Sequence, residues 1–178
     1  PDWSKLEPPD AMPWPFKILF VGVDNGDRQS PELNLNSEYA NIVCALEKTQ
    51  LKDKIQIRQL FYSKWFDVME AIRIERPTDL HLGCHSTKKG LELFRTVVTP
   101  DMISQLEDWN RFARSQGWPY LRFALLNACE SENLAQEFNK YVDFAIGHVG
   151  EVDDKDALNF TSSFYELVFR RCHLLSAF

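Results

Sequence analysis

The chain has 178 residues, which is enough for one ordinary domain with a single core. Hydrophobic residues make up 44% and charged residues 26% of the sequence, values typical of a globular domain and not of a disordered or fibrous chain. The formal net charge of −6 disfavours broad binding to nucleic acid or to an anionic membrane, because both need a basic surface.

The first part of the chain is expected to be a proline-rich linker or N-terminal extension over residues 1–16, and residues 17–178 are expected to form the domain. This start suggests a module cut from a longer polypeptide. No apolar run approaches the roughly 20 residues that span a bilayer, and no secretory pattern opens the chain, so a cytoplasmic location is expected. The cysteines form no CxxC pair and are expected to be free thiols.

Strands and helices are expected to alternate. Short β-branched and apolar runs predict strands, and apolar residues spaced by three and four predict helices with one buried face. The expected strands are 17–23, 55–61, 80–84, 121–126 and 143–149, with a small hairpin at 91–94, and helices begin near residues 34, 63, 99, 130 and 153. This alternation predicts an α/β fold, a three-layer α/β/α sandwich with a mostly parallel central sheet.

Polar residues follow the ends of the expected strands, where ligands gather in an open parallel sheet. Cys129 lies at a strand-to-helix junction, where backbone N–H groups favour the thiolate, and His85 ends a second apolar run. If the two strands are neighbours, His85 can accept the thiol proton. The sequence therefore predicts a Cys129–His85 catalytic pair.

Other interpretations of these residues stay open. A cysteine after an apolar strand is often a core residue, and a histidine at a strand end is often a polar cap. A zinc site would need His81 and His85 to converge, yet an extended strand separates them by about 13 Å, so no metal is expected. No phosphate-binding glycine motif follows the first strand, so no nucleotide cofactor is expected either.

Three stretches of the sequence resemble the motifs of one known family. Asn127-Ala128-Cys129-Glu130-Ser131 is similar to the nucleophile motif of CHAT domains, a caspase-like branch that includes relatives of separase. Residues 80–86 resemble the histidine motif of that family, residues 90–93 its hairpin, and residues 145–165 its last block. The resemblance runs from about residue 17 to about residue 168.

The resemblance implies a caspase-like sandwich and a cysteine endopeptidase that cuts a protein or peptide substrate without a cofactor. Cys129 would be the nucleophile, His85 the base, and the backbone N–H groups of Ser86 and Cys129 the oxyanion hole. Two residues depart from the family: Ser86 replaces the usual glycine, which places the geometry of that hole in question, and Cys84 replaces a small residue.

The resemblance also implies a pocket for the residue before the cut, lined by Asp24, Gly83 and Asn127. Asp24 would favour a basic residue there, although it could instead be only a turn residue. The expected partners are a substrate protein and a regulatory protein or further domains, as in bacterial defence or signalling systems, with neither nucleic acid nor membrane. The alternative is an inactive scaffold that binds other proteins.

Overall fold

The computed structural model describes residues 16–24 and 33–175. The predicted linker, residues 1–16, therefore lies outside the described residues except for Phe16, which begins the first strand. Within the described ranges, no helix is both long enough and apolar enough to cross a membrane.

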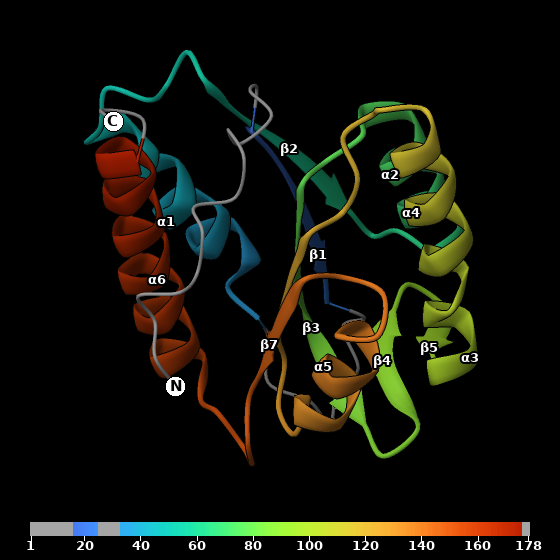
Figure 1. Ribbon diagram of the computed structural model, residues 1–178. Helices are drawn as coiled ribbons and strands as arrows, with labels where there is room; N and C mark the ends of the chain where they lie inside the picture. Colours follow the sequence, from blue (N-terminus) through green and yellow to red (C-terminus); the bar gives the residue numbers. More distant parts are fainter. Residues whose placement is uncertain (1–15, 25–32, 176–178) are drawn as a thin grey trace, which may run out of the picture.

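Strands and helices alternate along most of the described chain (Figure 1). The strands are β1 (Phe16–Val23), β2 (Ile55–Phe61), β3 (Asp79–Thr87), β4 (Gly90–Leu93), β5 (Thr96–Val98), β6 (Phe123–Asn127) and β7 (Phe144–Gly147). The helices are α1 (Leu35–Glu47), α2 (Trp65–Glu75), α3 (Pro100–Ile103), α4 (Gln105–Ser115), α5 (Glu132–Phe138) and α6 (Asp154–Leu175).

The central sheet is mostly parallel. Its parallel strands lie side by side in the order β2-β1-β3-β6-β7, and β4 and β5 extend β3 as an antiparallel hairpin. If the hairpin is left out and β6 and β7 are counted as the fourth and fifth strands, the order is 2-1-3-4-5, which is that of flavodoxin-like doubly wound sheets. The order in which strands are added reverses between β1 and β3, and ligands bind beyond the carboxyl ends of the strands at such a point.

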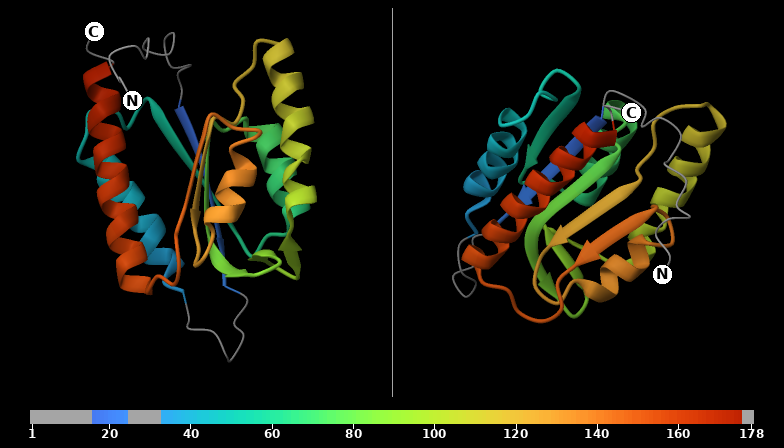
Figure 2. Two further views of the ribbon diagram at one scale, coloured as in Figure 1. Left: turned by 60° about the horizontal axis from the view of Figure 1, so that its bottom comes forward. Right: turned by 60° about the vertical axis from the view of Figure 1, so that its left-hand side comes forward.

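Helices cover both faces of the sheet. Figure 2 shows α1 and α6 together on one face and α2, α4 and α5 on the other, and α1 packs closely against α6. The prediction of a three-layer α/β/α sandwich with a mostly parallel sheet is thus confirmed.

Two hydrophobic cores fill the space between the layers. Successive residues of β1 point to opposite faces, so that Ile18 and Phe20 join the core under α1 and α6, while Leu19 and Val21 join the core under α2, α4 and α5. All four side chains are fully buried. A strand covered on both faces is apolar along its whole length, which explains the unbroken run of β1.

The structure differs from the predicted elements at three places. β3 continues through His85 to Thr87, because its last residues pair with β4. β5 was not predicted, since three residues carry too little pattern. The helix expected from residue 99 is divided at Ser104 into α3 and α4, where the Ser104 hydroxyl donates to the carbonyl of Asp101 at 2.7 Å.

Candidate active site at the carboxyl edge of the sheet

His85 and Cys129 lie near the carboxyl ends of two neighbouring strands. β3 pairs with β6 in parallel, with Gly83 opposite Asn127 at the last paired position. His85 follows Gly83 by two residues on β3, and Cys129 follows Asn127 by two residues in the turn after β6. The Ser86 hydroxyl donates a hydrogen bond to the carbonyl of Cys129, so the backbone of this turn contacts β3.

The imidazole of His85 faces a carboxylate. Its Nε2 atom is buried, makes no hydrogen bond within the described residues, and lies 3.9 Å from Oδ1 of Asp24 at the end of β1. The other carboxylate oxygen of Asp24 accepts a hydrogen bond from the backbone N–H of Leu33 at 3.0 Å. Asp24 thus fixes the chain before α1, as a turn residue would, and also places negative charge beside His85.

The sulfur of Cys129 contacts the backbone of Val152 in the segment that leads into α6. The Val152 N–H donates to Sγ at 3.4 Å, and the Val152 carbonyl lies 3.5 Å from Sγ. Cys129 itself is half-buried, whereas Cys44 is exposed and Cys84 is buried. A backbone N–H aimed at sulfur stabilises its thiolate form, and the carbonyl can accept the proton of the neutral thiol.

Two cavities lie at the carboxyl edge of the sheet. One, of about 460 Å³, is lined by the ends of β1 and β2, the start of α1, and the carboxylates of Asp24 and Asp154. The second, of about 480 Å³, is lined by Lys88 and Lys89 of the β3–β4 turn and by residues near the start of α5, among them Glu130. The first cavity has no lysine or arginine among its described lining residues, so its charge is negative.

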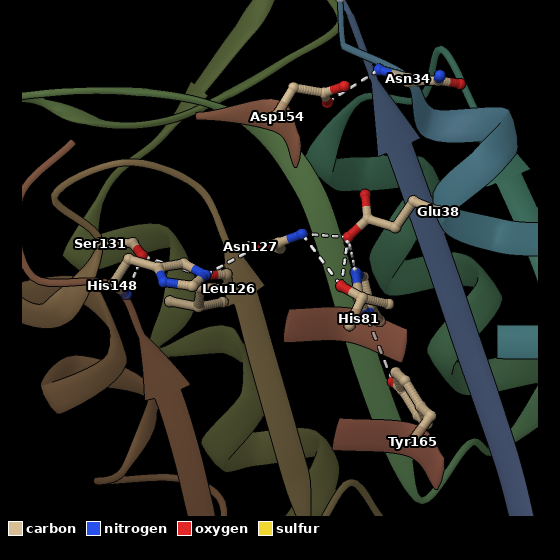
Figure 3. Close-up of polar contacts among 10 residues, drawn as sticks. Asn34, Glu38, His81, Leu126, Asn127, Ser131, His148, Asp154 and Tyr165 are labelled. Carbon is tan, nitrogen blue, oxygen red and sulfur yellow. Dashed lines mark hydrogen bonds and ion pairs between the residues drawn. The ribbon is translucent and has the colours of Figure 1, made fainter. Parts of the chain in front are cut away.

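The predicted pocket residues Gly83 and Asn127 both lie against the buried carboxylate of Glu38, and Figure 3 shows its contact with Asn127. A Cβ atom on Gly83 would meet Oε2 of Glu38 at 2.7 Å, so Glu38 lies directly against this glycine. Asn127 is 7% exposed, and its amide nitrogen donates to Glu38 Oε1 and, at 3.2 Å, to the hydroxyl of Thr161. Of the three predicted pocket residues, Asp24 is the one that lines the acidic cavity, and it contributes a negative charge there.

Glu38 is held in a buried polar network that links α1, β3 and α6. His81 is fully buried, with Nε2 2.9 Å from Glu38 Oε1 and Nδ1 3.2 Å from the hydroxyl of Tyr165. Burial alone would raise the pKa of Glu38, but His81 and the hydrogen bonds from Asn127 and Thr161 outweigh it and lower the pKa below 4.5. Glu38 is therefore an ionised buried carboxylate.

His148 joins this network from the loop after β7. Its Nε2 atom lies 2.7 Å from the side-chain amide oxygen of Asn127, and its backbone N–H donates to the hydroxyl of Ser131 at 2.9 Å. Burial lowers the pKa of His148 below its ordinary 6.5. The sequence assigned no role to His148 or Glu38, because their partners are 21 and 89 residues away in the chain.

The remaining candidate ligands do not converge. Cys84 points to the opposite face of the sheet, where it belongs to the core, and burial raises the pKa of its thiol far above the ordinary value. Among the residues that the structure describes, no group of three or more His, Cys, Asp or Glu side chains could hold a metal ion.

Comparisons with known proteins give a mixed picture. No family model matches the chain. A curated protein of Gillisia limnaea, "Probable protease", is 27% identical over 159 residues, which cover 85% of this chain and 27% of that protein. The chain thus spans about a quarter of the length of this relative.

Similar solved structures include two enzymes named as reductases. An NAD(P)H:quinone oxidoreductase from Methanothermobacter marburgensis has 11% identity and a TM-score of 0.45, with 87% of this chain and 98% of that chain covered. An azoreductase from Bacillus anthracis has 8% identity and a TM-score of 0.41, with 88% and 99% covered. At these values the likeness concerns the arrangement of strands and helices.

The expectation of a caspase-like cysteine endopeptidase, a hydrolase of protein substrates, is wrong. No family model for such a peptidase matches, and the solved structures similar to this chain include an NAD(P)H:quinone oxidoreductase and an azoreductase. The physical reason lies in the fold: a parallel sheet places polar residues at its carboxyl edge whatever the reaction. Short motifs at strand ends therefore predicted the fold correctly and the reaction incorrectly.

A flavin phosphate does not fit the described part of the acidic cavity. A bound phosphate needs backbone N–H groups or cations, and it is repelled by nearby carboxylates. Here the carboxylates of Asp24 and Asp154 flank the start of α1, where Asp154 Oδ1 accepts from the N–H of Asn34 at 3.2 Å. The described lining residues instead suit a positively charged group.

Proposed function

We propose that the chain is an enzyme that binds a positively charged ligand in the acidic cavity and transfers a group through the thiol of Cys129. The observation that supports it is the parallel pairing of β3 with β6, from whose carboxyl ends His85 and Cys129 both come, together with the 3.9 Å between His85 and Asp24. The relative from Gillisia limnaea is named as an enzyme, which supports the general part of this proposal.

The proposed step is nucleophilic. Cys129 Sγ bonds to an electrophilic carbon of the ligand while His85 takes the thiol proton, and the leaving group departs with that proton. A nucleophilic acceptor that carries a proton, in the cavity lined by Lys88 and Lys89, then attacks the same carbon and breaks its bond to sulfur, and its proton passes through His85 to Sγ to regenerate the thiol. The backbone N–H groups of Ser86 and Cys129 are the proposed donors to negative charge that develops on the ligand.

Asp24 is the proposed specificity residue. Its carboxylate lines the acidic cavity and lies 3.9 Å from His85, so a cationic ligand in the cavity gains attraction. Asp154 adds a second negative charge to the lining, and the exposed ring of Tyr62 offers a face to a cation.

Charged thiol reagents test this proposal directly. We would label the protein with a trimethylammonioethyl methanethiosulfonate and with its sulfonatoethyl counterpart, and follow each cysteine by mass spectrometry. Cys129 is expected to prefer the cationic reagent by about tenfold relative to exposed Cys44, the factor that corresponds to roughly 1.4 kcal/mol of differential attraction.

Variants locate the cause of that preference. Asp24→Asn should remove most of it, and Asp67→Asn, a change of charge on α2 away from the cavity, should leave it intact. If wild-type Cys129 reacts no faster than Cys44 with either reagent, the proposed nucleophile is wrong. If the charge preference survives in Asp24→Asn, the proposed ligand charge is wrong while the nucleophile stands.

A further inference from the structure

The segment from His148 to Asp153 forms a short cover over Cys129. It leaves the end of β7, carries Val152 against the sulfur, and then enters α6. Its backbone is tied to the α5 side by two bonds: the N–H of Glu130 donates to the carbonyl of Gly150 at 2.8 Å, and that of Glu132 to the carbonyl of His148 at 3.2 Å. The position of the Val152 N–H therefore depends on what holds this segment.

The side chain of His148 ties the same segment to the middle of the sheet. It lies 2.7 Å from Asn127, and its ring meets the ring of Phe160 edge-on with centroids 5.2 Å apart. Figure 3 shows His148 and Glu38 on opposite sides of Asn127. A contact chain thus runs from the buried carboxylate to the loop over the thiol.

The chemistry of the partners fixes the direction of each hydrogen bond in this chain. The carboxylate of Glu38 offers only acceptors, so the amide nitrogen of Asn127 must face it. The carbonyl oxygen of Asn127 is then left for His148, which must donate from Nε2. Glu38 consequently orients Asn127, and Asn127 selects one tautomer and one ring position of His148.

We propose that His148 is a positioning residue for Cys129: held by Asn127 and Glu38, it fixes the 148–153 segment so that the Val152 N–H points at the sulfur. It touches neither the sulfur nor the ligand, and it acts through the backbone of Val152. This inference rests on the proposed role of Cys129. It assigns a purpose to a buried ionic network that the reaction itself does not use.

The test compares three variants of the full chain. His148→Ala removes the donor to Asn127, His148→Gln restores a donor of similar reach, and Asn139→Ala is the matched control. Asn139 holds the opposite end of β7, where its side-chain oxygen accepts from the N–H of Ala145 at 2.6 Å. All three leave His85, Asp24 and Glu130, the charged and titratable groups around the sulfur, unchanged.

The readout is alkylation of Cys129 by iodoacetamide as a function of pH, with Cys44 as the internal reference. In His148→Ala, the rate of alkylation at pH 7 should fall about tenfold, because the Val152 N–H no longer points at the sulfur. His148→Gln should stay within about twofold of the wild type. Asn139→Ala should match the wild type.

Two results would overturn the inference: an unchanged alkylation rate in His148→Ala, or a His148→Gln variant as slow as His148→Ala. If wild-type Cys129 reacts no faster than Cys44, the proposed function is refuted and alkylation no longer tests the role of His148. Hydrogen exchange of the Val152 amide tests that role independently, because the exchange should accelerate at least about tenfold in His148→Ala and not in Asn139→Ala. Unchanged exchange would refute the role of His148.

Discussion

A buried carboxylate at the amino edge of the sheet should make the protein less stable as the pH rises. Asp79 begins β3, is 7% exposed, and its Oδ2 atom has no hydrogen-bond partner among the described residues. Burial raises the pKa of Asp79 from 3.8 to about 7, although the hydroxyl of Thr78 and the charge of Arg122 act in the opposite direction. The protonated form of Asp79 is therefore the one that the folded state favours.

The magnitude follows from linkage. Between pH 3.8 and about 7 the folded protein holds a proton on Asp79 that the unfolded chain has released, so stability falls by about 1.36 kcal/mol per pH unit. Over this window the protein loses at most about 4 kcal/mol of stability. Below the window both states are protonated, and above it both are ionised, so Asp79 adds no further slope.

Asp79→Asn keeps the shape of the side chain and removes the charge. We expect the variant to match the wild type near pH 4 and to gain stability progressively until about pH 7, reaching at most about 4 kcal/mol. The assay is urea unfolding at closely spaced pH values, with the difference between variant and wild type cancelling the other titrating groups.

Asp143→Asn is the matched control at the same edge. Asp143 accepts from Arg122 at 2.7 Å but is more exposed, so its loss should cost about 1 kcal/mol or less without a slope that grows from pH 4 to 7. A stability gain for Asp79→Asn that is equal at pH 4 and pH 8, or a loss at pH 8, would refute the reasoning.

Three further changes probe the network, the core and the close backbone contact. Glu38→Gln should destabilise the protein by about 3 kcal/mol or more at pH 7, because it removes the buried carboxylate beside His81. The difference in stability between wild type and variant should narrow in acid, because the lowered pKa of Glu38 stabilises the folded wild type only while Glu38 is ionised. Urea unfolding at several pH values measures this difference, and an equal cost at pH 3 and pH 7 would contradict it. Asn110→Ala removes two donated bonds of 2.8 Å, to Leu121 and Tyr141, and one accepted bond of 3.1 Å, so about 3 kcal/mol should be lost in thermal unfolding, against a small effect for exposed Ser115→Ala. Gly147→Ala would bring Cβ within 2.6 Å of the Ser131 carbonyl and should destabilise the protein by about 2 kcal/mol or more, whereas Gly117→Ala meets no atom within 4 Å and should cost only about 1 kcal/mol for its left-handed backbone; equal melting temperatures for the two variants would contradict the clash.

Local pattern was enough to predict most elements of the fold. The apolar run of β1, the alternation of β2 and the stripe of Leu106, Trp109 and Ala113 on α4 carry their own periodicity, and each appears in the structure. The breaks were harder: the division at Ser104 depends on one side-chain bond, and β5 exists only because β4 offers it a partner.

The candidate pair was also accessible from sequence, but its surroundings were not. Cys129 and His85 each end an apolar run, and parallel pairing of neighbouring runs is a small extrapolation. Nothing local to α1 indicated that Glu38 would be buried at 4% exposure, because its partners come from β3, β6 and α6. His148 was invisible as a network member for the same reason.

The sequence by itself determined most of the strands and helices, that they form a sandwich with a mostly parallel sheet, and that Cys129 and His85 lie at its carboxyl edge. Periodicity and turn chemistry are local properties, and they suffice for that much. Only the tertiary structure decided the strand order, the acidic cavity at Asp24 and Asp154, and the Glu38–Asn127–His148 chain. These depend on which distant residues meet, and the charge and hydrogen bonds made there, more than any short motif, constrain what the site can do.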